Sequence, residues 1–182
     1  MDTSPTPTPE AAMRHWVDAV VVGLDLCPFA RRVVRADHVR YVTTPAATLE
    51  ALLPVAHEEL MELAELRAPE GTTLILAPGF SDFETFLNGV RLIEGLIVDL
   101  ELEGVIQVAH FHPHYRFAGV PPEATSHYTN RAPVPAYHLL REEEVTAGVA
   151  AHPDPAGIPA RNIARLAALG EAAIRRLAGL DP

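Results

Sequence analysis

The 182-residue chain contains no lysine, so all 14 of its basic residues are arginine. Lysine forms the Schiff base of covalent amine catalysis, anchors pyridoxal phosphate and binds nucleotide phosphates in the phosphate-binding loop. The sequence therefore excludes these three kinds of site, and we expect no pyridoxal phosphate cofactor. Any anion that the protein binds must be held by arginine, by a helix N-terminus or by a metal ion.

Cysteine is nearly absent as well, since Cys27 is the single one in the sequence. One cysteine excludes an internal disulfide and a CxxC redox pair. The first ten residues, MDTSPTPTPE, are polar and proline-rich, and no apolar run approaches the roughly 20 residues that span a bilayer. We therefore expect a soluble, cytoplasmic protein that makes no contact with membranes.

Positive charge is also scarce, because 24 acidic residues outnumber the 14 arginines and give a formal net charge of -10. A chain of this charge is repelled by nucleic acid, and we expect no nucleic-acid partner. Apolar residues make up 48% of the sequence, as in an ordinary globular domain. The length suits one buried core, and we expect a single domain over residues 9–182 after a flexible tail at residues 1–8.

The hydrophobic periodicity predicts helices that alternate with short strands. A helical stripe begins at Pro9 and ends near Leu26, a capping box at Ser81–Glu84 opens another helix, and a last helix follows Pro159. A further helix is expected over 48–66, and strands over 38–44, 72–78, 105–111 and 137–142.

This order of elements gives a β-α-β-α-β core. It predicts a small α/β domain with a mixed sheet of three to five strands, of which the first three are parallel if they are neighbours. A ferredoxin-like α+β arrangement is the alternative.

A loop at residues 112–138 is rich in histidine and proline and follows the third strand. Ligand sites of α/β proteins gather at the carboxyl ends of strands, and a loop of this length inside a domain is often functional. The pattern is compatible with a zinc or iron site, with histidines that act as acid, base or substrate clamp, and with structural histidines. Five of the nine histidines are involved: His110, His112, His114, His127 and His138.

The end of this segment, TNRAPVPAYHLLRE, adds polar and cationic side chains on a backbone stiffened by two prolines. Arg131, held beside imidazoles, suits a bidentate grip on a carboxylate or phosphate, so a small anionic molecule is a candidate ligand. The alternative is an ion pair between Arg131 and an acid such as Glu123 or Glu142. Asn130, His138 and Arg141 lie in the same stretch.

The stretch LCPFARR raises the question of a reactive thiol. Pro28 at the first position of a short helix would place Cys27 at the N-cap, where the helix dipole lowers a thiol pKa. Arg31 and Arg32 would act in the same direction. The alternative is a buried cysteine that fills a turn, since free cysteine behaves as a small hydrophobe.

Taken together, the segments LCPFA, LEGVIQVAHFHPHYRFAG, TNRAPVPAYHLLRE and RN resemble the bacterial family called domain of unknown function 1415, from about Trp16 to Asn162. The family brings no established reaction, but it implies which residues form a site. His110, His114 and His127 fall outside its motifs. Those that match are Cys27, His112, Tyr115, Asn130, Arg131, His138 and Arg141.

The resemblance favours one site in which Cys27, His112, Arg131 and His138 carry the chemistry and Tyr115, Asn130 and Arg141 bind the ligand. Cys27, His112 and His138 would serve equally as a three-ligand set for zinc or iron and as a nucleophile with two bases. We therefore expect a small enzyme that acts on a small anionic substrate. A non-catalytic module that binds a ligand or a partner, and metal-free thiol chemistry at Cys27, are the alternatives.

Overall fold

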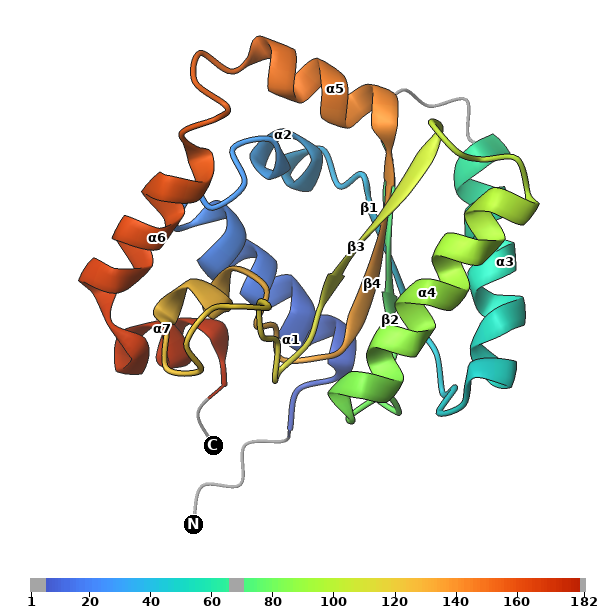
Figure 1. The fold of residues 1–182 in the computed structure, drawn as a ribbon, viewed down its shortest axis with the longest axis horizontal. Coiled ribbons are helices and arrows are strands. Elements are labelled where there is room, and N and C mark those ends of the chain that lie inside the picture. The colour runs from blue at the N-terminus through green and yellow to red at the C-terminus, as the bar shows by residue number, and fades with distance from the viewer. Residues whose placement is uncertain (1–5, 66–70, 181–182) are drawn as a thin grey trace.

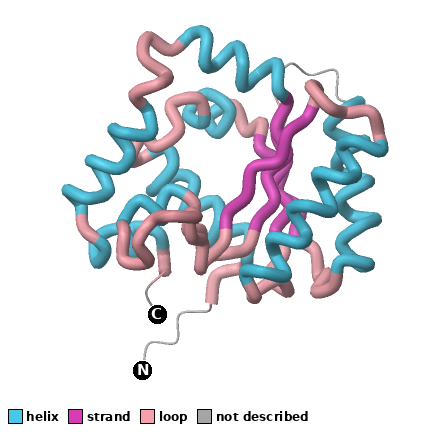
Figure 2. Tube along the Cα trace, in the orientation of Figure 1, coloured by secondary structure: helices cyan, strands magenta, loops and turns pink. Residues whose placement is uncertain are grey.

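The computed structural model describes residues 6–65 and 71–180, and in it a mixed sheet lies between two helical layers (Figures 1 and 2). The strands are β1 (Val39–Thr43), β2 (Thr72–Leu76), β3 (Ile106–Phe111) and β4 (Ala136–Arg141). The helices are α1 (Pro9–Trp16), the π-helix η1 (Val17–Val22), α2 (Ala30–Arg35), α3 (Leu49–Glu65), α4 (Phe83–Asp99), the 3-10 helix η2 (Thr125–Thr129), α5 (Glu142–Ala151), α6 (Ile158–Leu169) and α7 (Glu171–Ala178).

The strand order is β1-β2-β4-β3, which confirms the predicted α/β class and mixed sheet. β1 and β2 are parallel neighbours, whereas β4 is antiparallel to both β2 and β3 and separates them. The three strands of the β-α-β-α-β core therefore share one direction, although β2 and β3 do not touch. The ferredoxin-like alternative is not adopted, because a second helix, rather than a second strand, follows the first β-α-β unit.

One face of the sheet is covered completely by α3 and α4 (Figure 1). Their apolar faces meet the side chains of β4 that point this way, so that Leu52, Phe86, Ile93, Tyr137 and Leu139 are fully buried together. All five residues of β2 are buried, as expected for a central strand with helices on both sides.

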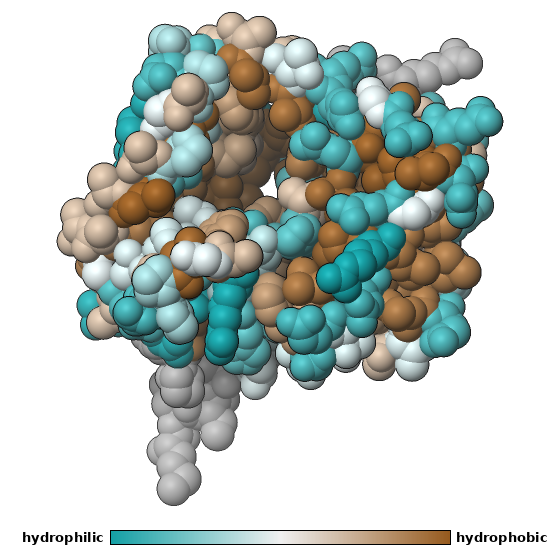
Figure 3. Space-filling model, viewed as in Figure 1, coloured by the Kyte–Doolittle hydropathy of each residue, from teal (hydrophilic) through white to brown (hydrophobic). Residues whose placement is uncertain are grey.

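The opposite face is covered only in part. α1, η1, α6, α7 and the loop with η2 pack against one end of it, around Met13, Trp16, Tyr128 and Ile174. α2 and α5 arch over the other end, and a space-filling view shows an apolar hollow between these helices and the sheet (Figure 3). α5 has no fully buried residue, which agrees with its place over this hollow.

Several boundaries differ from the prediction for local reasons. Asp82, not Ser81, is the N-cap of α4, because its carboxylate accepts the N–H of Thr85 at 2.8 Å. The helix expected after Pro159 is two helices, since Gly170 adopts a positive φ of 78° between α6 and α7. α5 was not predicted, because it carries no continuous apolar stripe.

The start of the first helix agrees with the prediction, since α1 begins at Pro9 and the Thr8 hydroxyl accepts the N–H of Ala11. Residues 1–5 of the predicted tail lie outside the described residues.

We predict that Gly89→Ala destabilises the protein by about 1–3 kcal/mol, because the added Cβ would overlap the Tyr137 hydroxyl and lie 3.1 Å from Leu52. Gly95→Ala on the same helix is the matched control, since nothing lies within 4 Å of its Cβ. This control should stabilise by about 0.5–1 kcal/mol. Urea denaturation measures both, and equal effects of the two substitutions would contradict the packing described for α4.

Candidate functional site

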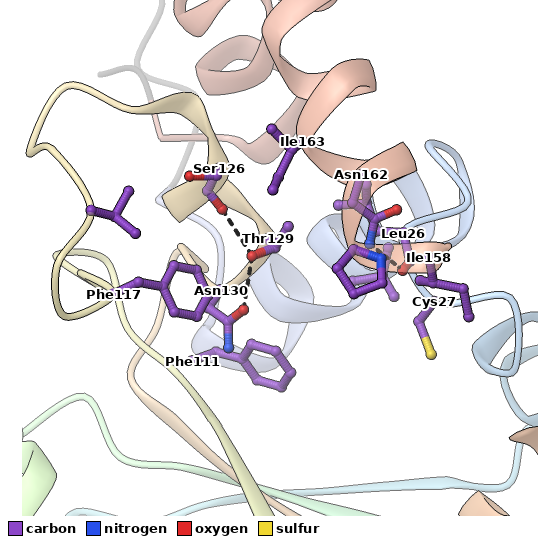
Figure 4. A pocket seen from close by; sticks show the side chains of 13 residues that line it. Leu26, Cys27, Phe111, Phe117, Ser126, Thr129, Asn130, Ile158, Asn162 and Ile163 are labelled. Carbon is purple, nitrogen blue, oxygen red and sulfur yellow. Dashed lines mark hydrogen bonds between the residues drawn. The ribbon is translucent and has the colours of Figure 1, made fainter. Parts of the chain in front are cut away.

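The hollow consists of two adjoining lobes. The larger, which we call the sheet lobe, has a volume of about 560 Å³ and lies between the sheet, α2 and α5, with Trp16, Thr72, Phe111, His138 and Val145 among its lining residues. The second, the loop lobe, has a volume of about 500 Å³ and lies between the η2 loop and α6 (Figure 4). Val21, Cys27 and Phe111 line both lobes, so the two lie side by side. Volumes of this size hold small molecules.

His138 is the histidine of β4 that lies on the wall of the sheet lobe. Its Nε2 is 2.6 Å from the Thr72 hydroxyl oxygen, and that hydroxyl donates its single proton to the Leu139 carbonyl, also at 2.6 Å. Because the Thr72 proton is used in this way, the Thr72 oxygen must accept the Nε2–H of His138. The tautomer is thereby fixed, and Nδ1 keeps its lone pair, for which no partner is present among the described residues.

The surroundings of His138 keep its ring neutral. Burial beside apolar side chains disfavours the imidazolium ion and lowers the pKa of His138 from 6.5 to about 4. At neutral pH the ring is therefore a hydrogen-bond acceptor at Nδ1 and carries no charge.

Cys27 lies where the two lobes join, but its environment is not that of a thiolate. α2 begins at Ala30 rather than at Pro28, so Cys27 is not the N-cap of that helix. Burial raises the pKa of the Cys27 thiol, and the nearby carboxylate of Asp25 adds to this, while the backbone N–H groups of Phe29 and Ala30 act in the opposite sense. The predicted lowering of this pKa is therefore wrong, because desolvation outweighs the N–H groups.

The turn that carries Cys27 is fastened to α6. The side-chain amide of Asn162 donates to the Leu26 carbonyl at 2.8 Å (Figure 4). Arg165 donates to the carbonyls of Leu24 and Asp25, so three consecutive carbonyls are satisfied in a turn where Asp25 has a positive φ of 51°. These bonds fix the backbone next to Cys27, whose side chain lines both lobes.

His112 lies on the other side of the sheet, away from the hollow. It is fully buried against Phe83 and Phe86 of α4. Its Nδ1 accepts the N–H of His114 at 3.0 Å and its Nε2 donates to the Phe80 carbonyl at 3.0 Å, so both nitrogens are used. The structure therefore does not bring His112 together with Cys27 and His138, and it shows the structural alternative for this histidine.

The arginines expected to hold an anion bind carbonyl oxygens instead. Arg131 donates to the Tyr115 carbonyl at 3.0 Å and stacks on the Tyr128 ring at 4.8 Å, which pins the histidine-rich loop. Arg141 is buried and donates to the Leu63 carbonyl at the end of α3 at 2.9 Å. Neither arginine lines the hollow, and neither does Tyr115.

Asn130 and the remaining histidines belong to the histidine-rich loop or lie next to it, and two of them hold its backbone through hydrogen bonds. Asn130 lines the loop lobe, but its amide nitrogen donates to the His110 carbonyl at 3.0 Å. Its oxygen shares the proton of the Thr129 hydroxyl with the Ser126 carbonyl (Figure 4). His127 is buried with both ring nitrogens bonded to loop backbone. His110 stacks on Tyr115 with a buried, unpartnered Nδ1, for which we have no physical account, and His114 is exposed.

A metal centre finds no support in the geometry of residues 6–65 and 71–180. Nowhere in these ranges do three histidine, cysteine or acidic side chains lie close enough together to hold a metal ion. Of the three predicted ligands, Cys27 and His138 line the sheet lobe, while His112 lies behind the sheet.

Two residues of the hollow were missed by the sequence reasoning. Thr72 is a hydroxyl residue in a wholly buried strand, and a polar side chain in such a strand is a signal for a specific bond. Trp16 lines the sheet lobe and is 1% exposed, yet its indole N–H has no acceptor among the described residues. No sequence pattern indicated that lack of a partner.

We predict that the His138 ring is neutral and protonated at Nε2 at pH 5.5, as read by ¹⁵N NMR of the ring nitrogens. Between pH 6.5 and 4 the unfolded chain binds a proton that native His138 resists, so this residue lowers stability as the pH falls through that range. His138→Phe should lessen the loss of stability over the same range. A charged ring at pH 5.5, or a proton on Nδ1, would contradict the assignment.

Cys27 should react slowly with iodoacetamide at pH 7, and its rate should inflect above pH 9, because burial raises its pKa from 9.0. The protein has one cysteine, so mass spectrometry reads the reaction directly. An inflection below pH 8 would mean that a thiolate is stabilised at this turn and would restore Cys27 as a nucleophile.

Comparison with known proteins identifies the family of the chain but no reaction that it catalyses. The family model described as "Protein of unknown function (DUF1415)" matches residues 8–176. Searches of curated proteins and of solved structures found no match. Among the described residues no helix is both long and apolar enough to cross a bilayer. Because the match covers nearly the whole sequence, the chain belongs to the DUF1415 family.

Proposed function

We propose that the protein binds a small, uncharged, largely apolar molecule in the sheet lobe, where Nδ1 of His138 accepts a hydrogen bond from it. One observation carries the proposal: the Thr72 hydroxyl fixes the His138 tautomer and leaves a lone pair on the wall of an apolar hollow. Nδ1 has no hydrogen-bond partner among the described residues, so a ligand that supplies a donor there gains affinity and orientation together.

An uncharged ligand fits this lobe better than the small anion that the sequence suggested. His138 is neutral, and Arg131 and Arg141 bind backbone carbonyls elsewhere. Arg32 lines the sheet lobe, but the carboxylate of Glu144 lines it too and interacts with Arg32. An anion there would lose hydration while Glu144 offsets the charge of Arg32, which is unfavourable. An O–H or N–H group, by contrast, needs only the lone pair.

Enzymatic proton abstraction by His138 is the second candidate function, since Cys27 and His138 line one lobe. A general base works best when its pKa is near the working pH. With a pKa of about 4, His138 is a weak base at neutral pH, and this favours binding over proton transfer.

The test compares 1-naphthol with naphthalene, two probes that differ by one hydroxyl group. The preference of wild-type protein for 1-naphthol should fall by about two- to ten-fold in His138→Phe, the range expected for one hydrogen bond. Thr72→Val should also reduce the preference, because the tautomer is then free. Tryptophan fluorescence or calorimetry measures the affinities.

His114→Phe is the matched control, because His114 is exposed and outside the hollow. An unchanged preference in His138→Phe would overturn the proposal, and so would the absence of binding of either probe by the wild type.

A further inference from the structure

The two lobes share Val21, Cys27 and Phe111 as lining residues, and the groups on their walls indicate the shape of the ligand. We infer that the hollow binds a straight aliphatic alcohol, with its hydroxyl group beside His138 in the sheet lobe and its chain passing Cys27 into the loop lobe. This inference rests on the proposed function and adds to it the class of molecule and the role of the second lobe.

The polar groups of the sheet lobe match a hydroxyl. His138 offers an acceptor at Nδ1, and its ring packs on Phe111 with the two ring centroids 6.0 Å apart, as does Trp16 at 5.0 Å. The indole N–H of Trp16 is buried and is not reached from the hollow, so it offers the ligand no hydrogen bond. A hydroxyl supplies the one proton that Nδ1 accepts. A carboxylate can only accept.

The loop lobe suits a chain that makes no hydrogen bonds. The Thr129 hydroxyl is bonded to the Ser126 carbonyl and to Asn130, and the amide nitrogen of Asn162 is bonded to Leu26 (Figure 4). The amide nitrogen of Asn130 is bonded to the His110 carbonyl, and the Ser126 hydroxyl is the one further side-chain hydroxyl on this wall. The rest of the wall is mostly apolar, including Phe117 and Ile163. Methylene groups gain affinity there through burial alone.

Cys27 marks the passage between the lobes. Because its side chain lines both, a chain that occupies both lobes must lie against the thiol. An alcohol whose chain occupies both lobes should therefore slow the alkylation of Sγ of Cys27. Slower alkylation would then indicate that the chain crosses from one lobe to the other.

The experiment compares 1-butanol with 1-decanol by calorimetry and by the rate of Cys27 alkylation at pH 9. Each added CH₂ that is buried should raise the affinity by about four-fold. We expect 1-decanol to bind far more tightly than 1-butanol and to slow the alkylation. Tighter binding of decanoate than of 1-decanol at pH 7 would overturn the hydroxyl head group.

Ile163→Trp adds bulk to the wall of the loop lobe, and Ala164→Trp, at the next and exposed position of α6, is its matched control. Ile163→Trp should weaken 1-decanol at least ten-fold and leave 1-butanol unchanged, while Ala164→Trp changes neither. If Ile163→Trp has no effect although His138→Phe weakens both alcohols, the chain inference fails and the proposed function stands. If His138→Phe affects neither alcohol, the proposed function itself fails.

Discussion

The site depends on the two-residue alternation of β4, because this strand lies in the middle of the sheet and serves both faces. Tyr137 and Leu139 point into the core beneath α3 and α4, and the residue between them, His138, points into the hollow. A shift of one residue in the register with β2 would exchange the two sets. The pairing of Leu74 with His138 sets the Thr72 hydroxyl within reach of Nε2 and so decides which nitrogen faces the ligand space.

The period of the apolar residues was sufficient to predict the strands, the long helices and the α/β class. α3 and α4 have one apolar face each, and β2 is a short apolar run, so local pattern and tertiary burial agree. The place of β4 between β2 and β3 could not be predicted, since it depends on pairing between residues distant in sequence. α5 was missed for a related reason, because a helix over a hollow needs no strong apolar stripe.

Residue type was a poor guide to the site. His112 and His138 resemble each other in sequence, but one has both nitrogens bonded to backbone and the other has a free lone pair. Arg131 was predicted to bind an anion. The histidine- and proline-rich loop, however, has many backbone carbonyls that need a hydrogen-bond donor, and Arg131 donates to one of them. What separates His112 and Arg131 from His138 is the number of hydrogen bonds that each already makes, and that number is known only from the three-dimensional structure.

The hollow is the consequence of a sheet whose second face is covered at one end and bridged at the other. Its apolar wall, one acceptor of fixed tautomer and one thiol at the junction are the features on which the proposed ligand binding rests. The most direct test is a crystal structure of the protein grown with 1-naphthol. We predict electron density for the ring in the sheet lobe, with its oxygen within hydrogen-bond distance of Nδ1 of His138. A sheet lobe filled by the side chains of α2 and α5 would contradict the account.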